Sequence, residues 1–97
     1  MEKSVSSRDY SLFLDRLKDA RKKAGLTQQQ LARLLGETQS FVSKCERGER
    51  RLDIVEVRTF CIALSVPFSS FATQLDSLLK QEEGKGRARA IEKEQGR

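Results

Sequence analysis

Two short amphipathic segments separated by a turn of only three residues constrain the fold of this chain more than any other feature. The first segment follows Thr27, and the second follows Thr38 and closes at Gly48. Gly36 begins the turn between them, and glycine readily adopts the left-handed conformation that ends a helix. Two helices joined by so short a turn are held at a steep angle, so the second helix can project from the domain. A simple hairpin of two packed helices has the same spacing and stays open as an alternative.

Apolar residues at helical spacing predict three further helices around this pair. We expect helices over about 11–24, after Asp53 and after Pro67. A chain of 97 residues has room for one small core, and helices packing side by side are the economical way to build it. The sequence therefore predicts an all-α domain of five helices.

The predicted core follows from the inward face of each helix. We expect it to contain Phe13, Leu17, Ala20, Ala24, Leu31, Ala32, Leu35, Val42, Cys45, Val57, Phe60, Cys61 and Leu64, with Leu52 and Ile54 packing where the fourth helix begins. The fifth helix carries a longer apolar stripe than a small core needs, namely Phe68, Phe71, Leu75 and Leu78 or Leu79. That surplus is a candidate dimer surface. The chain has no histidine with which the two cysteines could share a metal, so we expect no metal. Both cysteines lie in apolar periodic segments, so we interpret them as buried free thiols, with a disulfide as the less favoured alternative.

The two ends of the chain differ in composition from its middle. Residues 1–10 are polar, and residues 81–97 combine charges, glycines and glutamines with almost no apolar side chains. Such segments bury too little surface to order themselves, so we expect a folded domain at 11–80 flanked by a flexible N-terminal segment and a disordered charged tail. A weak helix around 87–95 stays open as an alternative for the tail. No apolar run is long enough to span a bilayer, and the first residues do not resemble a signal peptide. We therefore expect a cytoplasmic protein without membrane contact.

Positive charge is concentrated in the central part of the chain. Between Arg16 and Arg51 there are ten basic and four acidic residues, a balance of +6, while the whole chain carries +5. A basic segment within a near-neutral remainder favours a polyanionic partner, because lysine and arginine displace the counterions of phosphates. A solvated surface would also be basic, so charge alone leaves both interpretations open.

The third predicted helix offers side chains that can recognise bases. Gln39, Ser40, Ser43 and Lys44 lie on its outer face. Glutamine can bond adenine N6 and N7, lysine can donate to guanine O6 and N7, and serine accepts either partner. The spacing predicts a helix that enters the major groove of double-stranded DNA, although an ordinary solvent-exposed helix could look similar.

The residues of this region resemble the XRE family of helix-turn-helix regulators, relatives of the phage lambda repressor. The resemblance rests on Leu26-Thr-Gln-Gln-Gln-Leu-Ala-Arg-Leu-Leu-Gly36 followed by Thr38-Gln-Ser-Phe-Val-Ser-Lys-Cys-Glu-Arg-Gly48, and it covers about 13–75. It implies a compact five-helix lambda repressor-like domain that binds palindromic operators as a homodimer. Half-sites would then lie about 34 Å apart or a multiple of this distance.

The resemblance also implies roles for individual residues. Gln39, Ser40 and Lys44 match base-reading positions, and Ser43 shares their face; the expected phosphate contacts are Thr27, Gln28, Thr38, Arg47, Arg50 and Arg51. Gln28 should also brace the start of the reading helix. Thr27 and Thr38 have an equally good explanation as helix caps. The family pairs an arginine with a glutamate at Arg21 and Glu46, which we interpret as a structural ion pair.

Three positions depart from the family pattern or are unusual within it. Cys45 replaces a larger residue, and Ser65 stands where a glycine commonly closes the fourth helix. Phe41 on the reading helix could pack beside Lys44, touch a thymine methyl or lean back on the helix pair.

The expected function is a sequence-specific DNA-binding transcriptional regulator, most simply a repressor. The alternative is a protein-interaction module, such as an antitoxin-like partner that uses the fifth helix and the tail. We find no residues typical of an enzyme, a phosphate loop or a metal cluster, so no catalysis, cofactor or small-molecule substrate is expected.

Overall fold

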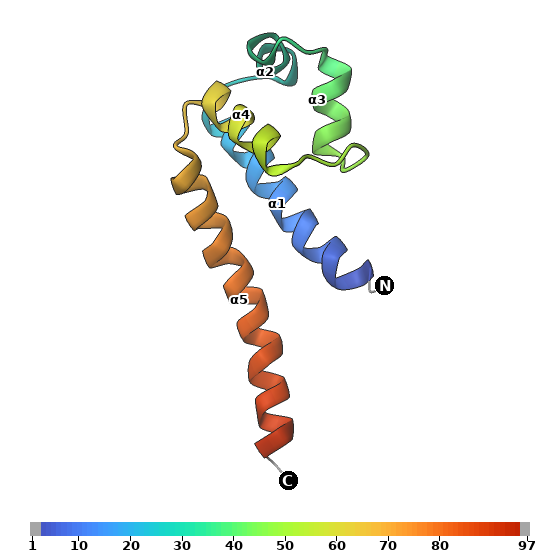
Figure 1. The fold of residues 1–97 in the computed structure, drawn as a ribbon, viewed down its shortest axis with the longest axis vertical. Helices are drawn as coiled ribbons and strands as arrows, with labels where there is room; N and C mark the ends of the chain where they lie inside the picture. Colours follow the sequence, from blue (N-terminus) through green and yellow to red (C-terminus); the bar gives the residue numbers. More distant parts are fainter. Residues whose placement is uncertain (1–2, 96–97) are drawn as a thin grey trace.

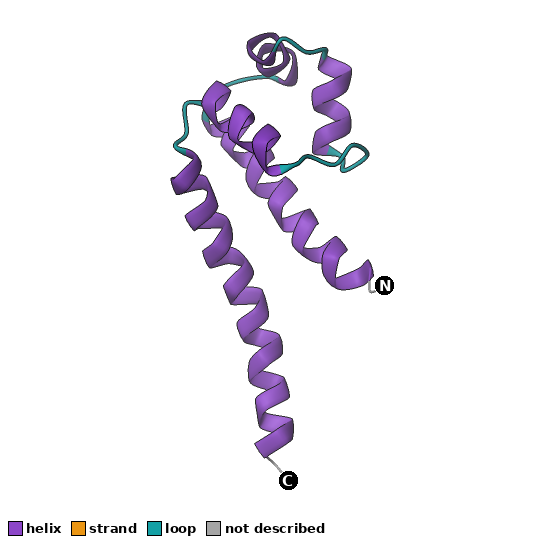
Figure 2. Ribbon diagram, viewed as in Figure 1, coloured by secondary structure: helices purple, strands orange, loops and turns teal. Residues whose placement is uncertain are grey.

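The chain folds into five helices, and the computed structural model describes residues 3–95, with side chains from 8 to 84. The helices are α1 (Lys3–Lys23), α2 (Gln28–Leu35), α3 (Gln39–Glu46), α4 (Ile54–Leu64) and α5 (Phe68–Gln95) (Figure 1). No strand occurs within the described range, where short loops join the helices (Figure 2). The predicted all-α, five-helix architecture is confirmed.

Local hydrogen bonds set the starts of the three central helices. The Thr27 hydroxyl accepts from the Gln30 backbone N–H, and the Gln30 side chain accepts from Thr27 N–H, which completes a capping box. Asp53 and Glu56 form the same reciprocal pair at α4. The Thr38 hydroxyl caps α3 by accepting from the backbone N–H of the residue three positions on. All three predicted starts are confirmed.

A residue in the left-handed conformation lies at the end of each of the three central helices. Gly36 ends α2 at φ 70°, a conformation that suits a residue without Cβ. Ser65 ends α4 at φ 60° and ψ 38°, so here a serine adopts the conformation that the family usually gives to glycine. Gly48 was expected to close the third helix; α3 ends at Glu46 with Arg47 as its cap, and Gly48 follows at φ 80°, so this expectation is confirmed.

The core lies between α1, α2, α3, α4 and the start of α5, and all five helices contribute side chains to it. Its most buried large side chains are Leu17, Leu31, Val42, Cys45, Phe60, Cys61 and Phe71. Two of the predicted core positions were wrong. Ala24 is exposed because it follows the last residue of α1 and leaves the helical stripe. Ile54 is 69% exposed because it is the first residue of α4 and borders an open groove. Leu35, Leu52 and Val57 are half-buried.

Both outer helices are longer than the apolar pattern predicts. Helix α1 begins at Lys3 instead of residue 11, and α5 continues to Gln95. The added segments are polar, but most of their residues tolerate a helix, and glutamine, glutamate, lysine and arginine favour it. An exposed ion pair of 3.3 Å between Arg8 and Glu82 connects the two extensions. Residues 1–2 and 96–97 of the predicted flexible segments lie outside the described residues, and the mobility of 1–10 and 81–97 stays a prediction.

The two cysteines are buried and free, as predicted. Burial raises the pKa of both thiols, Cys45 and Cys61, so each is protonated and acts as a small apolar side chain.

No single described helix is long and apolar enough to cross a membrane. One bent pair, α4 with 68–84 of α5, passes the same test of length and composition with an angle of 114° between its helices. This pair supplies Phe60, Leu64 and Phe71 to the core.

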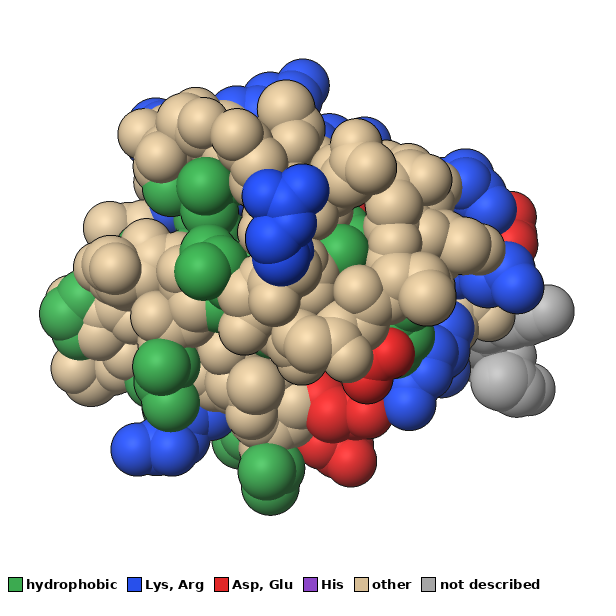
Figure 3. Space-filling model, turned by 90° about the horizontal axis from the view of Figure 1, so that it is seen from above, with side chains coloured by type: hydrophobic (Ala, Val, Ile, Leu, Met, Phe, Trp, Pro, Cys, Tyr) green, Lys and Arg blue, Asp and Glu red, His purple; other side chains and the backbone are tan. Residues whose placement is uncertain are grey.

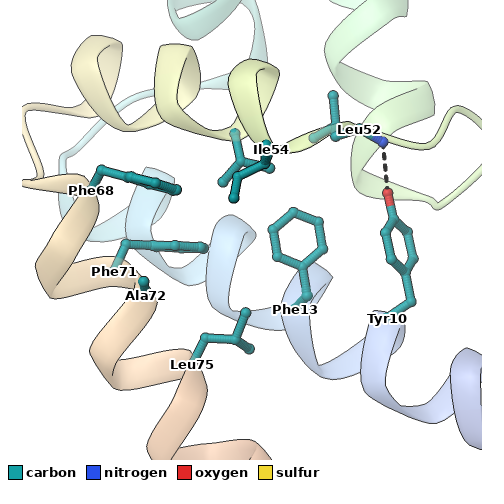
Figure 4. Close-up of a pocket in the computed structure, with 9 residues that line it drawn as sticks. Tyr10, Phe13, Leu52, Ile54, Phe68, Phe71, Ala72 and Leu75 are labelled. Atoms are coloured by element: carbon teal, nitrogen blue, oxygen red, sulfur yellow. Dashed lines mark hydrogen bonds between the residues drawn. The ribbon is translucent and has the colours of Figure 1, made fainter.

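An apolar groove of about 320 Å³ opens between α1, the start of α4 and α5. The side chains that line it point toward one another from these three helices and from the loop before α4 (Figure 4). They are Tyr10, Phe13, Leu52, Ile54, Val57, Phe68, Phe71, Ala72 and Leu75. We call this feature the α1–α5 groove.

Candidate nucleic-acid interface

Helix α3 turns one face into the core and leaves the other free. Val42 and Cys45 are fully buried, whereas Gln39, Ser40 and Lys44 are exposed. The helix stands at one edge of the domain, between α2 and the loop that leads to α4 (Figure 1). Three of the four predicted base-reading side chains thus share an accessible face. Ser43 is half-buried beside them.

A buried ion pair fastens the end of α3 to α1. The Arg21 guanidinium contacts both carboxylate oxygens of Glu46, with Nε to Oε2 at 2.7 Å and Nη2 to Oε1 at 3.1 Å. Arg21 also donates to the carbonyl of Leu26 at 2.8 Å. The two residues are only 8% and 4% exposed, so the bidentate pair is shielded from water. The predicted structural pair is confirmed.

This ion pair continues as a chain of hydrogen bonds to the start of α3. Gln28 donates through Nε2 to Oε1 of Glu46 at 2.9 Å, and Gln39 donates through Nε2 to Oε1 of Gln28 at 2.7 Å. The first residue of α3 is therefore braced by α2, which is in turn fixed to the buried carboxylate. The brace expected of Gln28 is confirmed, and its effect is to orient the Gln39 amide before any partner binds.

Thr27 and Thr38 serve as caps, and both remain exposed. Each hydroxyl accepts one backbone hydrogen bond, so its own O–H remains able to donate outward. The helix starts also offer unpaired backbone N–H groups, which favour anions. Capping is shown, and contact with phosphate stays a proposal.

Arg47 lies beside the exposed face of α3 that carries Gln39, Ser40 and Lys44, which we call the reading face. Its guanidinium pairs with Glu49 at 2.9 Å and also donates to the Ser43 hydroxyl oxygen. Hydrogen bonding to Arg47 lowers the pKa of the Glu49 carboxyl, so this exposed pair is charged at neutral pH. Ser43 is therefore already engaged, unlike Ser40.

Arg50 and Phe41 form a second contact between the loop and the helices. Arg50 pairs with Glu56 at 2.8 Å, and its guanidinium lies 5.0 Å from the centre of the Phe41 ring. The Phe41 ring packs 6.4 Å from that of Phe60 on α4. Of the three alternatives for Phe41, the structure favours the inward one, since the ring packs toward Phe60 on α4 and lines a small pocket together with Leu35 of α2.

Arg51 packs against Tyr10, an aromatic residue that was not predicted to belong to the site. Its guanidinium lies 4.1 Å from the centre of the Tyr10 ring on α1. Sequence patterns gave no signal for this contact, because it joins the first helix to a loop about forty residues later.

Basic side chains lie around the end of the molecule that is seen from above in Figure 3. Figure 3 shows lysine and arginine side chains distributed around this surface, with the acidic side chains gathered mainly at one edge. Among the described residues, no group of three or more acidic, cysteine or histidine side chains could hold a metal ion. The basic side chains of this surface suit a polyanionic partner.

Comparisons with known proteins agree with this geometry. A helix-turn-helix family model matches residues 17–71. An XRE-family like protein from Pseudomonas syringae pv. tomato str. DC3000 is 41% identical with a TM-score of 0.74, over 78% of this chain and 93% of that one. The clp gene regulator ClgR from Corynebacterium glutamicum shares the fold at 22% identity and a TM-score of 0.63, over 84% and 88% of the two chains. A comparison with curated proteins found no match.

Proposed function

Since the chain belongs to the XRE family of helix-turn-helix DNA-binding transcriptional regulators, we propose that it reads a specific operator through α3. The observation that carries this proposal is the hydrogen-bonded chain from Arg21 through Glu46 and Gln28 to Gln39. It fixes the Gln39 side chain on an exposed surface, although a solvated glutamine would ordinarily be left free. Preorganised donors and acceptors favour binding because less side-chain freedom is lost in the complex.

We assign base contacts to Gln39, Ser40 and Lys44, and a lesser one to Ser43 because Arg47 already occupies its hydroxyl. The proposed phosphate contacts are Thr27, Gln28, Thr38, Arg47, Arg50 and Arg51. They lie at the start of α2, at the start of α3 and in the loop after α3, so they surround the reading face. Phosphate contacts of this kind fix the register of the helix in the groove.

We further propose that the protein binds a palindromic operator as a homodimer and acts as a cytoplasmic repressor. Repression requires in addition that the operator lie where the bound protein covers a promoter. The proposed DNA-binding unit is 11–80 together with Tyr10, which packs against its core; mobility is proposed only for the more distant parts of the two flanking segments.

The α1–α5 groove favours one further protein contact, which we assign to the second subunit. An antitoxin-like interaction through α5 would use the same surface. Oligomeric state and partner binding therefore have to be measured separately from DNA binding.

The deciding experiment is selection from a random duplex library at two salt concentrations, comparing the wild type with Gln39→Ala/Lys44→Ala. We expect the wild type to recover an inverted repeat that survives the higher salt, because base contacts depend less on counterion release. The double variant should lose that selectivity and keep weak general binding. Equal, unselective binding by both proteins would contradict base reading by α3.

A further inference from the structure

Tyr10 contacts the loop between α3 and α4 through both parts of its side chain. Its hydroxyl oxygen accepts a hydrogen bond from the backbone N–H of Leu52 at 3.0 Å (Figure 4). Its ring lies 4.1 Å from the guanidinium of Arg51, within the range of a cation–π interaction. One residue of α1 thus fixes two consecutive residues of the loop.

Tyr10 is itself held by a series of aromatic contacts that reaches the core. Its ring centre lies 5.2 Å from that of Phe13, and Phe13 meets Phe71 edge-on at 6.1 Å. Phe71 is 2% exposed. Stacked and edge-on aromatic pairs favour defined orientations, so the Tyr10 ring is a fixed platform rather than a mobile surface group.

The three arginines of the loop differ in what neutralises them. Arg47 pairs with Glu49 and Arg50 pairs with Glu56. Within the described part of the chain, Arg51 has no carboxylate partner. A phosphate must compete with a carboxylate for the first two, whereas an aromatic ring orients a guanidinium without cancelling its charge.

We propose that Tyr10 is a positioning residue for DNA binding, which holds Arg51 as the principal phosphate contact of this loop. Tyr10 acts through Arg51 and the Leu52 backbone, and it contacts no DNA itself. The inference rests on the proposed function, since it requires DNA to lie along α3 and the loop that follows it. It adds a residue of α1, outside the helix-turn-helix, to the determinants of affinity.

The test is a double-mutant cycle on the affinity for the selected duplex, measured across a range of salt concentrations. Both subunits of the proposed dimer carry the substitution, so Arg51→Ala should weaken binding roughly tenfold and reduce the slope of log K against log salt by about 1.8, which is about 0.9 for each of two phosphate contacts. Tyr10→Leu should weaken binding by roughly threefold in the wild-type background and by clearly less in the Arg51→Ala background, where only its hydrogen bond with the Leu52 backbone is left to lose. Such coupling would not arise from a purely structural role.

Three variants serve as controls. Lys80→Ala removes a positive charge from α5, where Lys80 pairs with Asp76 and takes no part in the proposed DNA contacts, and should leave the slope unchanged. Arg47→Ala should lower the slope less than Arg51→Ala, because Arg47 is already paired. Tyr10→Phe keeps the ring under Arg51 and removes only the acceptor for Leu52, so it should retain most of the affinity and the full slope.

The outcomes separate this inference from the proposed function. Equal weakening by Tyr10→Leu in both backgrounds would overturn the positioning role and leave base reading intact. If Tyr10→Leu does not stay folded at the assay temperature, the salt dependence of the two arginine variants decides. An equal decrease in slope for Arg47→Ala and Arg51→Ala would overturn the positioning role of Tyr10. A wild-type protein that selects no sequence would overturn the proposed function and the inference together.

Discussion

Glu46 connects three helices through a single carboxylate. It ends α3, accepts two hydrogen bonds from Arg21 on α1 and a third from Gln28 on α2. Because the carboxylate is 4% exposed, water does not replace a lost partner. The same residue therefore stabilises the fold and, through Gln28, orients Gln39.

Removing either member of the buried ion pair should destabilise the domain strongly. Arg21→Met and Glu46→Met each leave one buried charge unpaired, which costs about 3 to 5 kcal/mol. The double variant Arg21→Met/Glu46→Met leaves no charge behind, so its free energy of unfolding should lie closer to the wild type than that of either single variant. Urea unfolding of the four proteins measures this.

The double variant also separates stability from DNA binding. It removes the acceptor that fixes Gln28, so operator affinity should remain below wild type even where the fold is restored. Losses of stability that simply add in the double variant would show that the two charges act independently, contrary to the distances in the structure.

At the scale of elements, the sequence determined the helix starts because capping is local. Thr27, Thr38 and Asp53 each bond within three residues, and such patterns are readable in the chain. The reading face followed from periodicity, and the Gln28 brace followed from the family resemblance. No comparable local pattern in the sequence marks the start of α1 or the end of α5. The contact of Tyr10 with the loop depends on tertiary packing, which cannot be read from a local sequence pattern.

The end of α4 offers a test of backbone strain at one element boundary. Ser65 adopts a left-handed conformation, which costs an L-residue with a Cβ about 1 to 2 kcal/mol. Ser65→Gly should stabilise the domain by about 0.5 to 1 kcal/mol, since the greater freedom of glycine in the unfolded chain offsets part of the gain. Thermal or urea unfolding would detect the change.

Ser65→Ala is the matched control, because alanine also removes the hydroxyl but keeps the Cβ. It should not be more stable than the wild type. Equal stability of the glycine and alanine variants would contradict strain at this position.

At the scale of the whole molecule, the proposed dimer uses two surfaces at once: the α1–α5 groove contacts the second subunit, and α3 contacts DNA. A twofold dimer buries the same surface on both subunits, and operator half-sites then follow from the separation of the two α3 helices. Ile54, 69% exposed at the edge of the groove, is the apolar side chain there most open to a second subunit. The half-buried Leu78 continues the apolar stripe of α5 beyond the groove.

Sedimentation at micromolar concentration tests this arrangement with Ile54→Glu. We expect a wild-type dimer and a monomeric variant, because a buried unpaired carboxylate opposes association. The variant should stay folded, since the residue is exposed and glutamate is favourable in the first turn of a helix. Leu78→Glu extends the test to the stripe on α5.

Ile62→Glu is the matched control: it lies on the same helix, is 60% exposed and does not line the groove. It should remain dimeric. If the dimer is required for operator binding, only the groove variants should lose affinity for the inverted repeat while keeping that for a single half-site. A wild type that sediments as a monomer at every concentration would assign the groove to another partner and leave the reading helix to act on one half-site at a time.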